Sequence, residues 1–192
     1  MKTIEQLKED ILFDVTLRGH QMQFHSTWGL FSPRSIDNGS YLLIQHMDLQ
    51  DGQCTLDLGC GYGPIGLTIA RETPNGMVHM VDKDFVAVDF AKKNARINGA
   101  DNCRAYLSNA FSAVGEVQFD NIVSNLPAKA GGELLQIILC DARDHLKPGG
   151  QLVVVTISGL KAFIKRNFRE IFGNYRKVKQ GRTHTVAAAI KE

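Results

Sequence analysis

Long apolar runs are missing from this sequence of 192 residues. A helix that spans a bilayer needs about 20 predominantly apolar residues, whereas the longest apolar stretches here, around residues 134–140 and 152–157, are much shorter. The first ten residues are charged and lack the apolar segment of a signal peptide. These absences predict a cytoplasmic protein that does not enter a membrane.

Cysteine and histidine are few and scattered. The four cysteines form no Cys-x-x-Cys pair, and none of the six histidines falls in a catalytic or metal-binding spacing. Structural zinc sites depend on such pairs, so we expect no metal and reduced, mostly buried thiols. A Gly-x-Ser-x-Gly elbow is missing too, which argues against Ser40 or Cys60 as a nucleophile.

The composition is that of an ordinary globular chain, with 44% hydrophobic and 22% charged residues. These fractions exclude a disordered tail, a collagen-like rod and a disulfide-stapled miniprotein. A chain of this length corresponds to one domain, or to one domain with a small appendage. We expect residues 1–34 to form an N-terminal hairpin and cap segment, and residues 35–192 to form the main domain.

Positive charge is concentrated near the end of the chain. The segment from Lys161 to Arg182 has eight basic residues and one acid, Glu170, so its net charge is +7, and −5 is left for the rest of a chain whose total is +2. Such a basic stripe suggests a polyanionic partner such as RNA. A solvated helix face followed by an exposed hairpin would explain the same pattern.

Alternation of short apolar runs with amphipathic stretches predicts the fold. Weak helical character over residues 3–10 is followed by an expected hairpin over residues 15–24 and by a helix from an N-cap at Ser35 or Asp37 to about His46. Further strands are expected at residues 54–58, 77–81, 103–107, 119–124 and 152–157, further helices at 64–71, 84–98, 132–146 and about 160–172, and a closing antiparallel pair at 175–179 and 183–190. This order predicts a doubly wound α/β protein with a mostly parallel sheet and a C-terminal antiparallel hairpin.

The strand at residues 54–58 leads into a glycine-rich turn, Asp57-Leu-Gly-Cys-Gly-Tyr-Gly-Pro-Ile-Gly66. Glycines at alternate positions let the main chain approach a ligand closely, and the following helix N-terminus adds free N–H groups. Asp57 would repel a pyrophosphate but suits a ligand with an ammonium or sulfonium group. Asp82, which ends the next strand, is placed to accept hydrogen bonds from ribose hydroxyls. Because the turn also contains the dinucleotide pattern Gly-x-Gly-x-x-Gly, a nicotinamide-dependent oxidoreductase is one alternative.

The same turn resembles motif I of class I S-adenosylmethionine-dependent methyltransferases. The resemblance implies a Rossmann-like, seven-stranded sheet, S-adenosylmethionine as the cofactor, and Asp82 as the acid that binds its ribose. The segment Ser108-Asn-Ala-Phe111 is similar to the one in which a polar side chain contacts the adenine. The residues that this resemblance assigns to the cofactor are Asp57, Gly59, Cys60, Gly61, Gly63, Asp82, Lys83, Asn109, Ala110 and Asn125.

A second motif, Asn125-Leu-Pro-Ala-Lys-Ala-Gly-Gly132, follows the strand at residues 119–124. It resembles the Asn-Pro-Pro-aromatic motif of methyltransferases that act on exocyclic or amide nitrogens. The resemblance implies that Asn125 Oδ1 and the Leu126 carbonyl accept the N–H bonds of the target nitrogen, while Pro127 fixes their geometry. These three residues are the expected catalytic residues, and they would act by positioning and electrostatics without a strong base.

The second motif departs from the family pattern at Leu126, where a proline is usual, and at Ala128, where an aromatic residue is usual. The second change removes a stacking face, a contact worth about 1–3 kcal/mol per base. Phe31, Trp28 or Tyr62 could supply a substitute face. Lys129 could reach a substrate phosphate, or it could be a solvated loop residue. Phe31 and Lys129 are therefore the expected substrate-binding residues.

Residues from about 10 to 190 resemble the methyltransferase small-domain family, which includes bacterial ribosomal RNA guanine-N2 methyltransferases. The resemblance is carried by Leu30-Phe-Ser32, by Asp37-Asn-Gly-Ser-Tyr-Leu-Leu43 and by the two motifs in that order. It implies methyl transfer to a nitrogen of an RNA base, most simply guanine N2 of ribosomal RNA, with the basic stripe on the RNA backbone. Two further hypotheses fit the same motifs: a catalytically idle, cofactor-binding RNA-binding or assembly protein, and a small-molecule or protein-glutamine methyltransferase.

Overall fold

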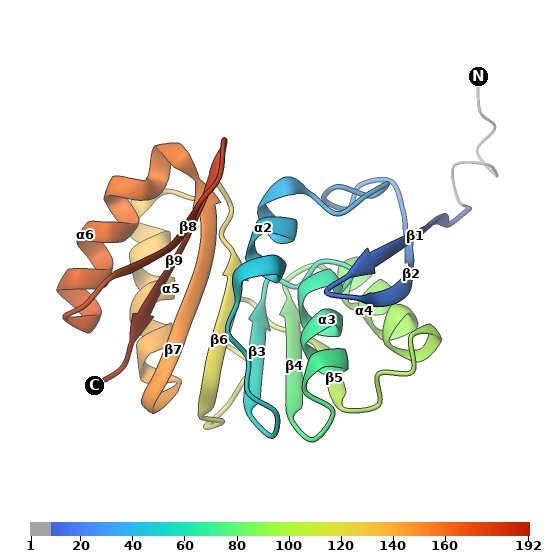
Figure 1. The fold of residues 1–192 in the computed structure, drawn as a ribbon, viewed down its shortest axis with the longest axis horizontal. Helices are drawn as coiled ribbons and strands as arrows, with labels where there is room; N and C mark the ends of the chain where they lie inside the picture. Colours follow the sequence, from blue (N-terminus) through green and yellow to red (C-terminus); the bar gives the residue numbers. More distant parts are fainter. Residues whose placement is uncertain (1–8) are drawn as a thin grey trace.

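A computed structural model describes residues 9–192 and shows helices packed on both faces of a central sheet (Figure 1). The strands are β1 (Ile11–Leu17), β2 (His20–Ser26), β3 (Cys54–Leu58), β4 (Met77–Asp82), β5 (Cys103–Leu107), β6 (Phe119–Asn125), β7 (Leu146–Ile157), β8 (Arg176–Gln180) and β9 (His184–Ile190). The helices are α2 (Asn38–His46), α3 (Pro64–Glu72), α4 (Phe85–Ile97), α5 (Gly132–Asp144), the 3₁₀ turn η1 (Ser158–Leu160) and α6 (Lys161–Phe172). The weak helical character predicted for residues 3–10 falls almost entirely outside the described residues.

The central sheet has seven strands in the order β5-β4-β3-β6-β7-β9-β8. The five strands from β5 to β7 are parallel, and β9 runs antiparallel to both β7 and β8. This arrangement confirms the predicted fold class. Within residues 9–192, no helix is long and apolar enough to cross a membrane.

Two hydrophobic clusters lie on the two faces of the sheet. Along β7, Leu152 and Val154 face the cluster covered by α5 and α6, whereas Val153 and Val155 face the cluster covered by α2, α3 and α4. Because both faces are buried, residues 152–155 of this strand are all apolar. The carboxyl ends of the parallel strands all point to the upper edge of Figure 1, where α2 and the β8–β9 turn also lie.

Local sequence signals account for the starts of α2, α3 and α4. The side chain of Asp37 accepts hydrogen bonds from the N–H groups of Gly39 and Ser40, and Asp84 accepts one from Val86, so each is an N-cap. Pro64 occupies the first turn of α3, where its missing N–H has no cost. These starts confirm the sequence prediction.

The N-terminal hairpin forms a separate two-stranded sheet beside α3 and α4 (Figure 1). Arg18 and Gly19 both have positive φ, of 48° and 87°, as the tight turns of two-residue hairpins require. Asn94 of α4 fixes the hairpin, because its side-chain amide exchanges two hydrogen bonds with the main chain of His25, at 2.8 and 2.9 Å. The hairpin is longer than predicted, and a division of the chain at residue 35 stays a prediction.

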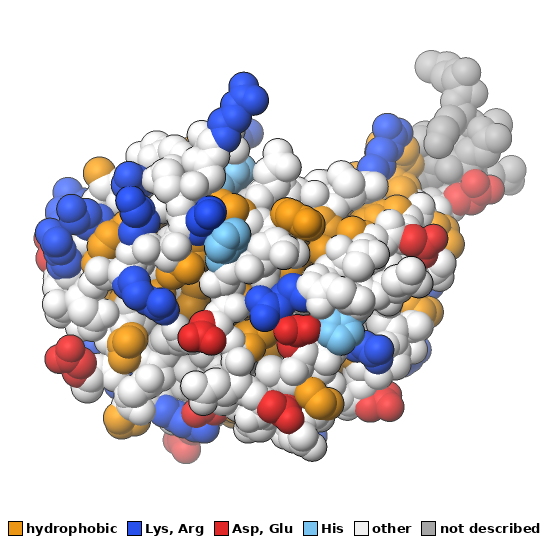
Figure 2. Space-filling view, viewed as in Figure 1, with side chains coloured by type: hydrophobic (Ala, Val, Ile, Leu, Met, Phe, Trp, Pro, Cys, Tyr) orange, Lys and Arg blue, Asp and Glu red, His pale blue; other side chains and the backbone are white. Residues whose placement is uncertain are grey.

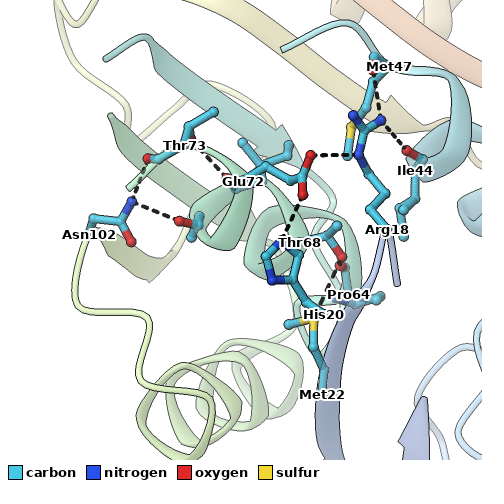
Figure 3. A network of polar contacts seen from close by, with 12 residues as sticks. Arg18, His20, Met22, Ile44, Met47, Pro64, Thr68, Glu72, Thr73 and Asn102 are labelled. Carbon is cyan, nitrogen blue, oxygen red and sulfur yellow. Dashed lines mark hydrogen bonds and ion pairs between the residues drawn. The ribbon is translucent and has the colours of Figure 1, made fainter. Parts of the chain in front are cut away.

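A polar network joins the hairpin turn to α3 (Figure 3). Glu72, at the end of α3, accepts a hydrogen bond from Arg18 Nε at 2.9 Å and lies 2.7 Å from His20 Nε2. Arg18 also donates to the carbonyls of Ile44 and Met47. Partial burial opposes ionisation of Glu72, but the hydrogen bonds to His20 and Arg18 outweigh it, so the pKa of Glu72 is lowered.

Glu72→Gln is expected to lower the free energy of unfolding at pH 7 by about 1–2 kcal/mol. A carboxyl whose pKa is lowered by folding stabilises the native state above its unfolded pKa, near 4.5, and that contribution is lost as the pH falls through the folded pKa. The difference between wild type and variant should therefore shrink between pH 5 and pH 3. Urea unfolding at both pH values measures it. Glu170→Gln is the matched control, because that exposed carboxylate lies 4.0 Å from Arg166 and should contribute little.

Helix α5 ends earlier than predicted. The expected helix over residues 132–146 stops at Asp144, and the expected turn at residues 147–150 belongs to β7. The reason is pairing with the end of the chain: the Gly149 N–H donates to the Lys191 carbonyl at 2.7 Å, and the Lys191 N–H donates to the Gly150 carbonyl at 2.9 Å. The local Pro-Gly-Gly pattern indicates a turn. The hydrogen bonds that make this segment part of β7 come from a distant part of the chain, and the local sequence does not show them.

Candidate active site

The candidate site lies where β3, β4 and β6 end. The connections from β3 lead toward β5 on one side, whereas those from β6 lead toward β7 on the other, so the order of strands reverses between β3 and β6. Ligands of doubly wound sheets bind at such a switch point. Three predicted site residues meet there: Asp57 near the end of β3, Asp82 at the end of β4 and Asn125 at the end of β6.

The glycine-rich turn between β3 and α3 is supported by β4. The N–H groups of Gly59 and Cys60 both donate to the Val81 carbonyl, at 2.8 and 2.9 Å. Gly59 and Gly61 have φ values of 75° and 56°, which favour glycine. A Cβ atom at either position would meet no heavy atom of the described chain within 4 Å. The turn therefore presents bare main chain to open space.

Cys60 and Gly63 support the turn from within. Cys60 is buried in the hydrophobic cluster of α2–α4, and this burial raises the pKa of its thiol. A Cβ at Gly63 would lie 3.1 Å from Leu67 Cδ1, so glycine allows α3 to begin close to the turn. A contact between Cys60 and a ligand would therefore involve the main chain.

Asp57 is a fully buried carboxylate below the turn. Its Oδ2 accepts a hydrogen bond from the Gly66 N–H in the first turn of α3, at 2.7 Å, whereas Oδ1 is buried without a hydrogen-bond partner in the structure. Burial raises the pKa of Asp57 to about 7, the hydrogen bond from Gly66 lowers it, and the charge of Asp82 raises it further. An orphaned buried carboxylate oxygen near a second acid, Asp82, is an arrangement that a positively charged ligand would satisfy.

Asp82 joins the turn to β4 and is only half-buried. Its Oδ2 accepts a hydrogen bond from the Gly61 N–H at 2.9 Å, and its Oδ1 accepts one from the Asp84 N–H at 3.0 Å. Each oxygen can accept a further hydrogen bond, so the carboxylate can still receive two hydroxyl donors. Lys83 follows it and is exposed.

Two exposed apolar side chains beside Asp82 were not predicted as site residues. Leu107 pairs with Asp82 across β4 and β5, and Phe85 begins α4 three residues after Asp82. Leu107 is 54% exposed and Phe85 is 67% exposed, values that core residues do not have. The two side chains offer apolar surface next to a hydrogen-bonding carboxylate. The sequence contains no signal for Phe85 beyond its place after Asp84.

The turn after β5 holds Asn109 at the same edge. The Ser108 N–H donates to the Asp82 carbonyl at 2.9 Å, and Ser108 Oγ donates to the Ala110 carbonyl at 2.7 Å. Ala110 has a φ of 49°, which is uncommon for a residue other than glycine. Asn109, which follows the residue bonded to Asp82, is exposed, while Phe111 is buried in the core.

Asn125 is held by two residues of α2 and its cap that were not predicted as site residues. Its Nδ2 donates to Ser40 Oγ at 3.0 Å and to the carboxylate oxygens of Asp37 at 3.2 and 3.3 Å. An ionised carboxylate only accepts hydrogen bonds, so the amide NH₂ must face Asp37, and Oδ1 faces the other way. The sequence predicts Asp37 as a helix cap. Its second contact joins positions 88 residues apart, which no local pattern indicates.

The main chain after Asn125 explains the departure at Leu126. The Leu126 N–H donates to the Val155 carbonyl at 3.1 Å, and its side chain is buried in the cluster of α5 and α6. A proline could not make this hydrogen bond, so Leu126 is anchored by pairing and packing. Pro127 and Lys129 lie on the exposed loop that follows, where the Pro127 carbonyl accepts a hydrogen bond from the Ala130 N–H.

Of the three aromatic residues suggested as a stacking face, Tyr62 does not fit. It is buried against Phe13 and Phe24, and its hydroxyl donates to the carbonyls of Ser32 and Ser35, at 3.1 and 3.3 Å. The sequence showed only its place in the glycine-rich turn. Tyr62 instead anchors the loop of residues 27–37.

That loop presents the other two suggested aromatic residues. Trp28 has the Arg34 guanidinium 4.5 Å from its ring centre. Phe31 is 72% exposed, which makes it the more accessible face of the two. The same loop leads directly to Asp37 and therefore to Asn125.

These residues fit a nucleoside with a positively charged end. The bare turn at Gly59 and Gly61 gives close access to the main chain, Asp82 has capacity for ribose hydroxyls, and the orphaned Oδ1 of Asp57 lacks a positive partner. Within residues 9–192, no group of three or more His, Cys, Asp or Glu side chains could hold a metal ion.

Comparison with known proteins gives a family for this arrangement. Residues 21–188 match the methyltransferase small domain. The uncharacterized protein YbxB of Bacillus subtilis is 38% identical over 143 residues, which are 72% of this chain and 70% of YbxB. Ribosomal RNA large subunit methyltransferase G of Cronobacter sakazakii is 31% identical over 183 residues, which are 91% of this chain and 48% of that protein.

A solved structure is similar over nearly the whole chain. The 16S rRNA N2 G1207 methyltransferase RsmC of T. thermophilus, in complex with AdoMet and guanosine, superimposes with a TM-score of 0.87 at 29% identity, and the match covers 95% of this chain and 51% of RsmC. The chain thus spans about half the length of the two ribosomal RNA methyltransferases. With a family match over most of its length, the chain belongs to the methyltransferase small domain family, as its sequence predicted.

Proposed function

We propose that this protein transfers a methyl group from S-adenosylmethionine to an exocyclic nitrogen of an RNA base, with guanine N2 of ribosomal RNA as the preferred acceptor. The observation that carries the proposal is the fixed orientation of Asn125, whose amide NH₂ is held by Asp37 and Ser40. A side-chain carbonyl aimed away from those partners at the carboxyl edge of the sheet is suited to accept an N–H bond of an amine. The fold and the family membership support the methyltransferase chemistry.

The cofactor would be held by the turn and by the two acids. When bound, S-adenosylmethionine supplies a methyl group that is attached to a positively charged sulfur. After the transfer, the rest of the cofactor is a neutral thioether. Gly59, Gly61 and Gly63 would allow close contact with its methionine and ribose parts, and Cys60 would contribute main chain only. Asp57 would face its positively charged end, and Asp82 its ribose hydroxyls. Lys83, Asn109 and Ala110 would contact its adenine.

Apolar side chains complete that adenine position. Leu107 pairs with Asp82, Phe85 begins α4 three residues after it, and both side chains are exposed, so a flat, largely apolar ring could contact them while Asp82 binds the sugar. This placement would explain why two large apolar side chains are exposed at the carboxyl edge of the sheet.

The acceptor nitrogen would be oriented by Asn125 and the main chain after it. An exocyclic amine of a base is a weak nucleophile because its lone pair is delocalised into the ring. Asn125 Oδ1 and the Leu126 carbonyl would accept its two N–H bonds, aim the lone pair at the methyl carbon, and stabilise the positive charge that develops on the nitrogen. Pro127 would limit motion of the loop. Phe31 would provide a stacking face, and Lys129 a cation for the substrate.

RNA as the substrate is supported by two independent features. The two relatives named for an activity are both named for methylation of ribosomal RNA, and the solved one contains guanosine. The basic stripe of this chain, residues 161–182, carries a net charge of +7, as a surface for a nucleic-acid backbone would. A cytoplasmic location, where ribosomal RNA is available, stays a prediction from the sequence.

The decisive experiment incubates the purified protein and methyl-labelled S-adenosylmethionine separately with naked ribosomal RNA, ribosomal subunits, total protein and small-molecule extract. Label is expected in RNA, and digestion to nucleosides should give N2-methylguanosine. Label only in protein or in small molecules would contradict the RNA proposal. Binding of the demethylated product, S-adenosylhomocysteine, without label in any sample would favour a non-catalytic RNA-binding protein. Binding of NAD instead would favour the oxidoreductase.

A further inference from the structure

A groove lies between α2 and the β8–β9 turn. It has a volume of about 430 Å³ and is lined by Asn38, Leu42, Gly181, Arg182, Thr183 and His184. Sites for small ligands have volumes of about 300–1,000 Å³, so the groove can hold one nucleotide unit. Gly181 allows the turn to approach α2, because a Cβ there would lie 3.0 Å from Leu42 Cδ2.

The groove shares a wall with the catalytic residue Asn125. At Gly39 a Cβ would lie 2.9 Å from His184 Cδ2, on the groove side, and 3.0 Å from Asp37 Oδ1, on the active-site side. Asp37 in turn holds the amide of Asn125. The Ser158 N–H donates to the Thr183 carbonyl at 2.8 Å, which fixes the turn at the carboxyl end of β7.

The chemistry of the lining favours an anion. Of the described residues that line the groove, one carries a permanent positive charge, and none is acidic. Arg182 is exposed, and the side-chain amide of Asn38 adds neutral hydrogen-bond donors, while the Thr183 hydroxyl lies 2.9 Å from His184 Nδ1. A guanidinium with nearby neutral donors is suited to phosphate oxygens. Leu42 gives the groove an apolar wall that a sugar or base can contact.

The groove lies at one end of the basic stripe of residues 161–182. Lys177 and Lys179 lie on β8, which leads into the turn, and Lys161 begins α6 directly after the 3₁₀ turn that contains Ser158. Figure 2 shows Lys and Arg side chains gathered over the α6 and β8 side of the molecule. A polyanion bound to this face would therefore reach the groove next to Asn125.

We propose that the groove binds a backbone phosphate of the RNA strand adjacent to the nucleotide whose base enters the Asn125 site, with Arg182 as the phosphate contact. This assignment rests on the proposed function, because it requires a polynucleotide substrate. The proposal gives Arg182 a different role from the other basic residues of the stripe. Arg182 would fix the register of the RNA strand, whereas the others would bind the RNA backbone at a distance from the target base.

Binding of a fluorescein-labelled, mixed-sequence single-stranded RNA to the full chain tests the phosphate contact. Arg182→Ala is expected to raise Kd about tenfold at 0.1 M salt and to reduce the slope of log Kd against log salt concentration by about 0.7, the value for one lost contact to a single strand. Arg182→Lys should recover part of the affinity. Arg104→Ala is the matched control, because this exposed arginine lies on β5, the opposite edge of the sheet, and it should change Kd less than twofold. Equal effects of the two alanine variants would overturn the proposal.

Inhibition of methyl transfer by guanosine, guanosine 5′-monophosphate and guanosine 3′-monophosphate tests whether the phosphate lies next to the target base. One monophosphate should inhibit the wild type about tenfold better than guanosine, and this preference should vanish in Arg182→Ala, whose affinity for S-adenosylhomocysteine should be unchanged. A wild type that does not distinguish the three compounds would overturn the proposal. Absence of methyl transfer to any RNA would contradict the proposed function, and with it the position of the phosphate beside a target base. The phosphate contact of Arg182 itself is still decided by the RNA binding of the two alanine variants.

Discussion

Asn125→Ala is expected to lower kcat for RNA methylation by about 10²–10³-fold, the cost of removing one preorganised group that stabilises charge in a transition state. The variant would lose the acceptor proposed for the target amine. Although the family resemblance also assigns Asn125 to the cofactor, the glycine-rich turn and the two acids proposed to hold most of the cofactor stay intact. The dissociation constant for S-adenosylhomocysteine should therefore change less than about threefold. Single-turnover methylation of ribosomal RNA, together with calorimetric titration of S-adenosylhomocysteine, measures both quantities.

Asp37→Asn is the matched variant that tests how Asn125 is oriented. Asparagine caps helices about as well as aspartate, so the start of α2 should be preserved. The carboxylate that forces the NH₂ of Asn125 toward α2 would however be replaced by an amide, which can both donate and accept. We expect kcat to fall about tenfold with little change in the free energy of unfolding. Full activity of Asn125→Ala would contradict the mechanism, and full activity of Asp37→Asn would contradict the orienting role of Asp37.

The fold was predictable because its signals are local and mutually consistent. The strands of the parallel part contain short apolar runs, and α2, α3 and α4 begin at Asp37, Pro64 and Asp84, which satisfy or avoid free N–H groups. The exception is the end of α5, where hydrogen bonds from Lys191 extend β7 through a segment that has a turn sequence. Strand pairing between distant parts of the sequence therefore accounts for the main difference between the predicted and the observed secondary structure.

In the candidate site too, local sequence signals place some residues, whereas other contacts depend on packing between distant segments. Asp57, Asp82 and Asn125 could be placed from the sequence, because each lies at the end of a predicted parallel strand and such ends meet at one edge. The contact of Asp37 with Asn125 could not, since it depends on how α2 packs across the sheet. Nor could the burial of Tyr62, because the sequence does not show that the N-terminal hairpin covers its ring with Phe13 and Phe24.

Asp57→Asn is expected to weaken S-adenosylmethionine binding about 10- to 100-fold at pH 8, the effect of losing a buried interaction with a charged group. The asparagine keeps the size of the side chain and an acceptor for the Gly66 N–H, so the turn should fold normally. Only the negative charge is removed. Methylthioadenosine, which has neither the sulfonium nor the ammonium group, is the control ligand, and its affinity should fall much less.

A stronger test compares wild type and Asp57→Asn in the pH dependence of two quantities, the affinity for S-adenosylmethionine and the free energy of unfolding. Burial raises the pKa of Asp57 to about 7 in the free protein, and a bound cation favours the ionised carboxylate, so it lowers that pKa. Wild-type affinity for S-adenosylmethionine should therefore rise with pH up to about 7–8, by as much as tenfold per pH unit below 7, relative to Asp57→Asn. Stability has the opposite sign: because folding raises the pKa, the free energy of unfolding of the wild type, relative to the variant, should fall between about pH 4 and pH 7 and then level off. Equal pH profiles of wild type and variant in both measurements would show that Asp57 is not the buried carboxylate that faces the positive charge.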